Sequence, residues 1–267
     1  MLKISLLFLV YFFGCVRGFN SRIAGGENAN ITSYPFLTAL LTNQGSGAFV
    51  QKCGGSILTS TAILSAASCF YTDGELNNAA WWRARVGSNN ANTGGTIYII
   101  NRITPHEDFS TATRVNDVAV LRTNLLISFQ PNLVAPARIV GTGYTYRDNE
   151  EVWAVGWGVT SAAGIVAPSQ QLQVALVRLI NQQTCTNRHN EPLSGFTVTN
   201  TMICAGFLDV GVQGQCEGDV GSPLLDSSGA VIGVFSYAHD CADIYFPDIN
   251  TRVASFTNWI IDAARAT

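Results

Sequence analysis

The sequence has few charged residues and lacks the patterns that mark metal-binding, fibrous or membrane-spanning proteins. Charged residues make up only 12% of its 267 residues, whereas apolar residues make up 47%, enough to fill one or two packed cores. No Cys-x-x-Cys or His-x-x-x-His spacing offers a zinc site, so no metal is expected. Internal repeats and low-complexity tracts are also missing, which argues against solenoid, fibrous and disordered proteins.

The main long apolar run lies at the N-terminus. Lys3 gives this segment a positive start, residues 4–16 are predominantly apolar, and Gly18 offers a small residue for cleavage. The run is too short to cross a bilayer, and a buried N-terminal strand is the alternative. We therefore expect residues 1–18 to be a signal peptide, residues 19–22 a short propeptide, and the protein to be secreted and extracellular.

Loss of the leader would make the chain more acidic. The first 22 residues hold three basic and no acidic side chains, so 12 basic and 18 acidic residues remain, a formal charge of −6. An acidic surface does not attract heparin, nucleic acid or anionic membranes. We expect neither a nucleic acid nor a membrane as a partner.

Seven cysteines are present, of which Cys15 falls in the leader. The other six are Cys53, Cys69, Cys185, Cys204, Cys216 and Cys241. An even number in an exported chain predicts three disulfides, because extracellular thiols oxidise. Their number alone does not decide how they pair.

Short strand-like segments recur along the chain, each rich in β-branched or aromatic residues and bounded by Gly, Asn, Ser or Pro. They cover residues 36–41, 82–86, 96–100, 118–121, 152–155, 172–176 and 231–235. Helical periodicity is clear only near the C-terminus, from Val253 to Ala263. This pattern predicts an all-β sandwich or barrel fold with a terminal helix, and residues 130–149 could connect two strand-rich halves.

Several motifs occur in a specific order. They are Arg22-Ile23-Ala24-Gly25-Gly26, Cys53-Gly54-Gly55-Ser56, Leu64-Ser65-Ala66-Ala67-Ser68-Cys69, Asn116-Asp117-Val118-Ala119, Gly156-Trp157-Gly158, Gly218-Asp219-Val220-Gly221-Ser222-Pro223 and Ser236-Tyr237-Ala238. In this order and spacing, the sequence resembles the chymotrypsin/trypsin-like serine protease family (peptidase S1 type) from Ile23 to the terminal helix.

The resemblance implies two six-stranded antiparallel β-barrels with a C-terminal helix and an active cleft between the barrels. The protease domain would span residues 23–267, with an N-terminal barrel at about 23–134 and a C-terminal barrel and helix at about 135–267. The disulfides implied are Cys53–Cys69, Cys185–Cys204 and Cys216–Cys241.

Two positions of the implied catalytic triad are substituted. Ser68 stands where the family has its histidine, Val220 stands where it has its nucleophilic serine, and Asp117 is retained. Valine has no lone pair with which to attack a carbonyl, and a serine hydroxyl is too weakly basic to act as a general base. We therefore expect no functional catalytic residue and hence no enzyme.

Four other side chains are candidates to replace the missing histidine and serine of the triad. His106, His189 and His239 are the histidines of the chain, and Ser222 lies two residues after Val220. We expect His106 and His189 to be solvated or structural. His239 is expected on the wall that binds the substrate main chain, and the Ser222 side chain need not face the cleft.

The resemblance also implies an oxyanion hole, an ion pair formed on activation, and a specificity pocket. Gly218 and Val220 would present an oxyanion hole, and Ile23 would pair with Asp219 after cleavage at Arg22. The specificity pocket would contain Gly214, Ser236, Ala238 and Asp248. Gly214 in place of the trypsin aspartate, together with Asp248, resembles the pocket of crab-collagenase-type proteases; a side chain that merely fills a disused pocket is the alternative.

Asn30-Ile31-Thr32 is a glycosylation sequon, which makes Asn30 a candidate acceptor. The segment from Ser88 to Asn92 lacks the acidic residues of the calcium loop found in some relatives, so no calcium and no other cofactor is expected.

The sequence hypothesis is a secreted, monomeric, inactive serine-protease homologue that binds peptides, protease inhibitors or an active relative in its cleft. The first alternative is a secreted serine endopeptidase with residual or unrecognised activity in digestive proteolysis. A second is a heparin-binding antimicrobial homologue, which the acidic charge disfavours. No accessory domain precedes Ile23, which disfavours a cofactor of a blood cascade.

Overall fold

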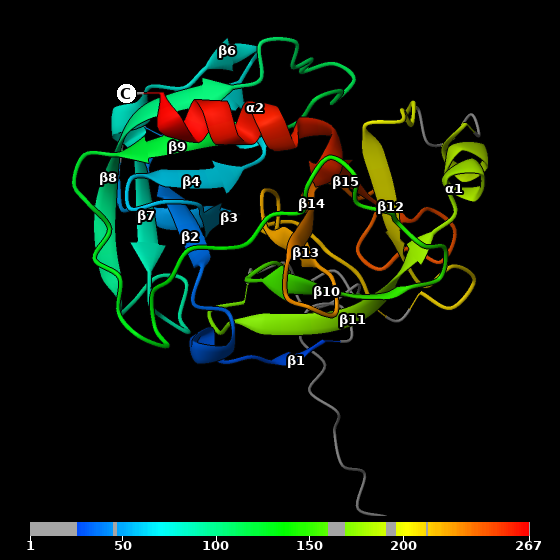
Figure 1. Cartoon of the computed structure of the whole chain (residues 1–267), viewed down its shortest axis with the longest axis horizontal. Coiled ribbons are helices and arrows are strands. Elements are labelled where there is room, and N and C mark those ends of the chain that lie inside the picture. The colour runs from blue at the N-terminus through cyan, green and yellow to red at the C-terminus, as the bar shows by residue number, and fades with distance from the viewer. Residues whose placement is uncertain (1–25, 45–46, 160–168, 191–195, 212, 267) are drawn as a thin grey trace, which may run out of the picture.

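Two closed antiparallel β-barrels of six strands each, followed by a C-terminal helix, make up the fold (Figure 1). The computed structural model describes residues 26–44, 47–159, 169–190, 196–211 and 213–266. The expected signal peptide, the propeptide, Arg22 and Ile23 lie outside the described residues. Within the described chain, no helix is long and apolar enough to cross a membrane. The architecture confirms the expected trypsin-like fold.

The first barrel has the strand order β2-β3-β4-β9-β8-β7. Its strands are β2 (Leu37–Thr42), β3 (Val50–Ile57), β4 (Ala62–Ser65), β7 (Trp82–Val86), β8 (Thr96–Pro105) and β9 (Ala119–Thr123). Buried and exposed residues alternate along most of β8, as expected for a strand with one face on a core. A hairpin of β5 (Tyr71–Thr72) and β6 (Glu75–Leu76) extends from it, and three short 3-10 helices, η1 (Ile31–Ser33), η2 (Ala67–Phe70) and η3 (Ala79–Trp81), lie between strands.

The second barrel closes because β11 pairs with both β10 and β12. Its strands are β10 (Glu151–Gly156), β11 (Gln173–Ile180), β12 (Met202–Gly206), β13 (Pro223–Leu225), β14 (Val231–Tyr237) and β15 (Asp248–Arg252). The short strand β1 (Glu27–Asn28) adds to β11 outside the barrel. A break in the register between β14 and β15 falls at Ser236, which leaves this residue outside the ladder of pairs.

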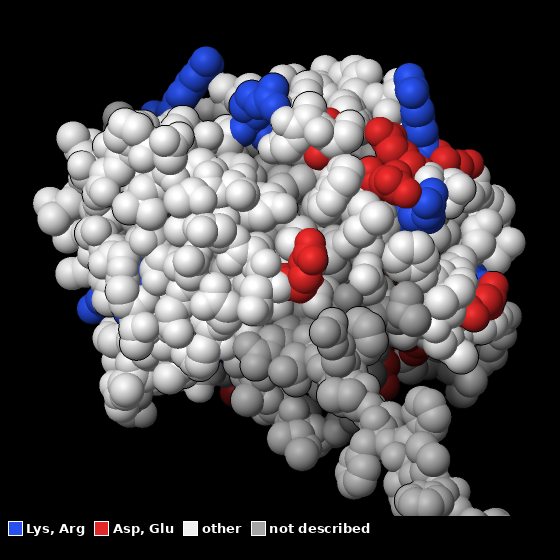
Figure 2. Space-filling model, turned by 90° about the horizontal axis from the view of Figure 1, so that it is seen from below, with Lys and Arg blue, Asp and Glu red and all other residues white. Residues whose placement is uncertain are grey.

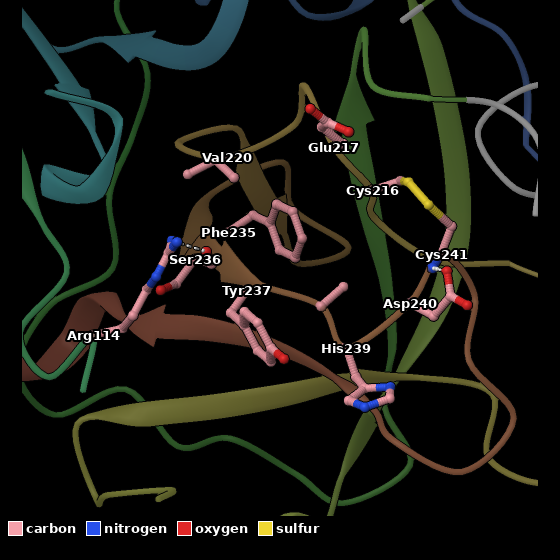
Figure 3. A pocket seen from close by; sticks show the side chains of 11 residues that line it. Arg114, Cys216, Glu217, Val220, Phe235, Ser236, Tyr237, His239, Asp240 and Cys241 are labelled. Carbon is pink, nitrogen blue, oxygen red and sulfur yellow. Dashed lines mark hydrogen bonds between the residues drawn. A yellow bond between two sulfur atoms is a disulfide. The ribbon is translucent and has the colours of Figure 1, made fainter. Parts of the chain in front are cut away.

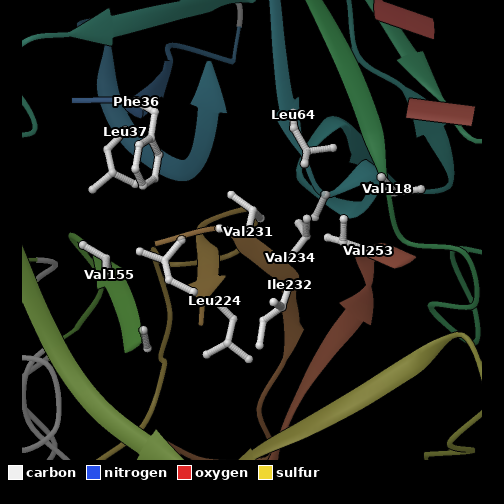
Figure 4. Close-up of a cluster of buried hydrophobic side chains, with 14 of the residues drawn as sticks. Phe36, Leu37, Leu64, Val118, Val155, Leu224, Val231, Ile232, Val234 and Val253 are labelled. Atoms are coloured by element: carbon white, nitrogen blue, oxygen red, sulfur yellow. The ribbon is translucent and has the colours of Figure 1, made fainter. Parts of the chain in front are cut away.

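One large hydrophobic cluster joins the two barrels. Leu37 and Leu64 come from the first barrel, whereas Val155, Leu224 and Val234 come from the second, and all five are buried together (Figure 4). Each Å² of apolar surface that is removed from water stabilises the folded state by about 25 cal/mol. The two barrels are therefore held as one body, which fixes the relative positions of residues that each contributes to the cleft.

The C-terminal helix α2 (Val253–Arg265) packs across β4 and β9 of the first barrel and β14 of the second (Figure 1). Its buried residues Val253, Phe256, Ile260 and Ala264 recur at three- and four-residue steps and form one apolar face. This helix was predicted from the sequence. The other α-helix, α1 (Gln182–His189), was not predicted, because its periodicity is weak; Asn181 caps it by accepting bonds from the N–H groups of Gln183 and Thr184.

Candidate active site

The triad-equivalent positions meet between the two barrels. Ser68 lies on η2 of the first barrel, Asp117 lies two residues before β9, and Val220 lies in the loop before β13 of the second barrel. Ser68 and Val220, together with Arg114, line a cavity of about 200 Å³. The structure thus brings together the positions that the sequence motifs predicted.

Asp117 is fully buried and accepts several hydrogen bonds. Its Oδ1 accepts from the Ser68 N–H at 2.7 Å, and its Oδ2 accepts from Ser68 Oγ at 2.8 Å and from Ser236 Oγ at 2.6 Å. Burial raises the pKa of this carboxyl, and the bonds from Ser236 and Ser68 oppose the rise. The carboxylate therefore holds the Ser68 hydroxyl at the place from which the family's histidine side chain would begin.

Val220 faces the cleft, since its side chain lines both the cavity next to Ser68 and a second cavity of about 280 Å³ (Figure 3). Among the described residues, the N–H groups of Gly218 and Val220 donate to no protein acceptor. Gly218 has φ +92°, a conformation that favours glycine and that shapes this loop. Two unpaired donors beside a cleft are the arrangement that stabilises a developing oxyanion.

The second cavity has the walls expected for a specificity pocket. Ser236 and Ala238 line one side, and the Cys216–Cys241 disulfide lines another (Figure 3). Gly214 and Asp248 are not part of the wall. They lie next to one another, and a Cβ added to Gly214 would lie 3.2 Å from the Cα of Ala242, which follows Cys241 of the wall.

Asp248 is buried, and its Oδ2 accepts a 2.6 Å hydrogen bond from the Gln215 N–H. A Cβ added to Gly214 would lie 2.8 Å from the same oxygen. Burial raises the pKa of Asp248 well above its usual range, and the charge of Asp219 adds to the rise. The carboxylate thus occupies the volume that a side chain at position 214 would need.

Asp219 is also buried, against the Gly156–Gly158 segment. Its Oδ1 accepts from the Gly158 N–H at 2.7 Å, and its Oδ2 accepts from the Cys216 N–H at 3.2 Å. Among the described residues, no basic side chain forms an ion pair with it. Burial raises its pKa to about 7. The pairing with Ile23 stays a prediction, because Ile23 lies outside the described residues.

None of the four alternative side chains is positioned as a substitute for the triad. The His106 ring packs on Phe256 and Trp259, away from the cleft. The His189 Nε2 lies 2.9 Å from the Pro247 carbonyl oxygen in the interior, and His239 lies 3.3 Å from Asp243 on the wall of the second cavity. Ser222 is buried, and its Oγ has no hydrogen-bond partner.

Sequence reasoning missed Arg114, which reaches into the cleft from the loop before Asp117. Its Nη1 donates to the Ser236 carbonyl oxygen at 2.9 Å and lies 4.0 Å from Asp117 Oδ2. Its position three residues before Asp117 was the available signal. The small side chain of Ser68 leaves room for this guanidinium between the barrels.

The structure contains the three disulfides Cys53–Cys69, Cys185–Cys204 and Cys216–Cys241. Asn30 is exposed, with its Oδ1 accepting a bond from the Thr32 N–H, so its glycosylation stays a prediction. In the described part of the chain, no three His, Cys, Asp or Glu side chains gather as a metal site. On the face shown in Figure 2, the described surface has few charged side chains and no gathering of Lys and Arg.

Comparison with known proteins gives the family. The family profile described as Trypsin matches residues 23–260. The chain belongs to the trypsin family. Among its relatives, alkaline trypsin B of Manduca sexta is 43% identical over 90% of each chain. Alkaline trypsin A of the same species is 42% identical over 92% of each, and trypsin CFT-1 of Choristoneura fumiferana is 42% identical over 90% of each.

These relatives contradict two expectations from the sequence: that the protein acts only by binding, and that it is not an enzyme. Proteins 41–43% identical to it over at least nine-tenths of its length are named trypsins. Both expectations rested on two substituted positions, Ser68 and Val220, whereas the similarity extends over the rest of the chain. The comparisons support a serine endopeptidase instead.

Proposed function

We propose that the chain is a secreted trypsin-family endopeptidase of digestive type, which hydrolyses peptide bonds after basic residues at a residual rate. Peptides and the loops of protease inhibitors would bind in the same cleft, and the protein would act as a monomer. The observation that carries the proposal is the pair of N–H groups on Gly218 and Val220, which donate to no protein acceptor among the described residues and belong to residues that line the cavity next to Ser68.

These two donors supply the chemistry that the substituted triad does not. A carbonyl oxygen placed between them would be polarised, and the charge that develops on it would be stabilised in the transition state. A water molecule can then add to the carbonyl carbon, and its proton passes to the nitrogen that leaves. Val220 has no hydroxyl, so this route forms no acyl-enzyme. Serine proteases that lack a triad member keep roughly a thousand-fold catalysis over water, which comes from the oxyanion hole and substrate binding together.

The preference for a basic residue rests on Asp248. Its carboxylate lies where a carboxylate at position 214 would lie, as in the crab-collagenase-type exchange of these two positions. No basic side chain of the described residues pairs with it. A buried carboxylate without a cation is unfavourable, so a bound Lys or Arg side chain would gain by pairing with it.

The test is hydrolysis of arginine and phenylalanine p-nitroanilides by protein cleaved after residue 22. We expect slow release of nitroaniline from the arginine substrate, with no initial burst, and a lower rate in Asp248→Asn. Asp262→Asn, at an exposed position of α2 that lines neither cavity, is the matched control for loss of a carboxylate. The proposal fails if the purified wild type releases no more product than buffer, or if Asp248→Asn leaves the rate unchanged.

A further inference from the structure

Arg114 lies where the two cavities of the cleft meet. It lines both of them, and it is the only Lys or Arg among the residues that line the larger one. Its guanidinium points toward Ser236, with Val220 across the opening (Figure 3). Arg114 is therefore placed to contact a ligand chain that occupies both cavities.

The guanidinium is held in place but keeps most of its donors. One N–H bonds to the Ser236 carbonyl oxygen at 2.9 Å, out of the five that an arginine offers. Asp117, at 4.0 Å, already accepts bonds from Ser68 and Ser236. The side chain is 35% exposed, so its remaining donors are open to a ligand.

The loop that carries Arg114 is fixed by its own backbone. The Arg114 N–H donates to the Ser110 carbonyl oxygen at 2.8 Å, and the Ser110 N–H donates to the Val115 carbonyl oxygen at 3.1 Å. Arg114 has φ +56° and Asn116 has φ +58°, conformations that residues other than glycine rarely adopt. The chain thus accepts backbone strain at the point where it presents this cation.

The cleft also contains an acidic side chain. Glu217 is exposed and also lines both cavities, and its Oε1 lies 3.9 Å from the Lys52 ammonium. A ligand side chain beside Arg114 therefore meets a cation whose neighbouring carboxylate, Asp117, already accepts hydrogen bonds from Ser68 and Ser236. A ligand side chain beside Glu217 meets a carboxylate whose charge is partly neutralised by Lys52.

We propose that Arg114 selects ligands with an acidic residue directly before the anchoring residue, so that their carboxylate pairs with its free N–H groups. Guanidinium and carboxylate fit as a two-bond pair, which is stronger than a neutral hydrogen bond. The Ser236 carbonyl oxygen can still accept a second bond from the ligand main chain, because it has two lone pairs. This inference rests on the proposed function: the cleft would recognise an acidic residue followed directly by a basic anchoring residue.

The experiment measures binding rather than turnover. Two peptides, acetyl-Ala-Glu-Arg-Ala-amide and acetyl-Ala-Gln-Arg-Ala-amide, are made with the bond after Arg reduced to an amine, so that it cannot be hydrolysed. Calorimetry with the wild type should show about tenfold tighter binding of the Glu peptide. Arg114→Gln should remove this difference and leave the affinity for the Gln peptide nearly unchanged. Arg178→Gln is the control and should keep the difference, because the Arg178 side chain is as exposed as that of Arg114, at 35%, and pairs with Glu151 outside the cleft.

Equal affinities of the two peptides for the wild type would overturn the role of Arg114, as would a difference that persists in Arg114→Gln. Failure of both peptides to bind would overturn it too. Hydrolysis of p-nitroanilides decides the proposed function separately. An active protein without the Glu preference would keep the function and lose this inference.

Discussion

The Asp248 carboxylate fills the space beside Gly214: a Cβ added to Gly214 would lie 2.8 Å from Asp248 Oδ2. One of these positions can hold a carboxylate only if the other has no side chain. The glycine and the aspartate are therefore a coupled pair, although they lie on different segments of the chain. Any change of specificity at one position must be matched at the other.

Gly214→Asp is expected to destabilise the protein on its own. It would place two buried carboxylates in contact, and like charges at that separation disfavour ionisation of both. We expect the midpoint of thermal unfolding to fall by roughly 5–10 °C, which is a loss of about 2–3 kcal/mol for a domain of this size. Gly214→Asp combined with Asp248→Gly should recover most of that loss. A single variant as stable as the wild type, measured by calorimetry, would mean that Asp248 points elsewhere.

The stability of the uncleaved protein is expected to depend on the ionisation of Asp219. Burial raises its pKa to about 7 in the folded state, against about 3.9 in the unfolded chain. The folded state therefore binds the proton more tightly, so stability is fully present below pH 4 and is lost as the pH rises to about 7. The loss from this group is roughly 4 kcal/mol.

Urea unfolding between pH 4 and pH 8 measures that slope. Asp219→Asn should flatten it in the uncleaved protein. After cleavage at Arg22, the new Ile23 ammonium should pair with the Asp219 carboxylate and remove the loss near pH 7. Removing one partner of such a buried pair costs about 3–5 kcal/mol. If the cleaved protein keeps the same slope as the uncleaved one, the predicted ion pair does not form.

The barrels and their disulfides could be predicted because local signals agreed with the fold. Strands such as β8 and β14 are rich in β-branched and aromatic residues, and α2 has a regular apolar face. The helix α1 could not, because its eight residues are mainly polar and tertiary contacts hold it. Its Cys185 is joined to Cys204, and its buried His189 contacts Phe196 and Phe246.

The site residues that belong to sequence motifs could be predicted, whereas those that depend on contacts between distant parts of the chain could not. Ser68, Asp117 and Val220 meet as the motifs implied. Asp248 was expected in the pocket; it is buried next to Gly214 and is not among the residues that line the cavity, so its part in specificity stays a prediction. Arg114 carries no motif. Its role depends on the contact with Ser236, which lies 122 residues away in the sequence.

His189 is expected to destabilise the fold in mild acid. Burial lowers its pKa, and its Nε2 lies 2.9 Å from the Pro247 carbonyl oxygen, which a neutral ring can already satisfy as donor. The unfolded chain takes up this proton near pH 6.5, before the folded one does. Stability from His189 is therefore present above that pH and is lost as the pH falls below it. In the cleaved protein, where pairing with Ile23 is expected to remove the opposing slope of Asp219, denaturant unfolding should show a drop between pH 7 and pH 5 that His189→Phe reduces; an unchanged drop would assign it to other groups.

Restoring the two substituted positions should raise the activity by orders of magnitude. In Ser68→His, the imidazole Nδ1–H would take the place of the Ser68 hydroxyl that now donates to Asp117 Oδ2 at 2.8 Å, and Ser236 Oγ would keep its bond to the same oxygen. Val220→Ser would add the nucleophile next to N–H groups that are already free. Triad members act as a unit, so each single variant should gain little, whereas the double variant should gain roughly a thousand-fold or more in kcat/KM.

Stopped-flow assays with an arginine ester should then show a burst, the sign of an acyl-enzyme, that the wild type lacks. Asp117→Asn in the double variant should lower turnover by about ten-thousand-fold, since it favours the wrong imidazole tautomer. A double variant that folds, binds arginine ligands and still shows no burst would mean that Arg114 blocks the imidazole, and Arg114→Ala in that background would then release the activity.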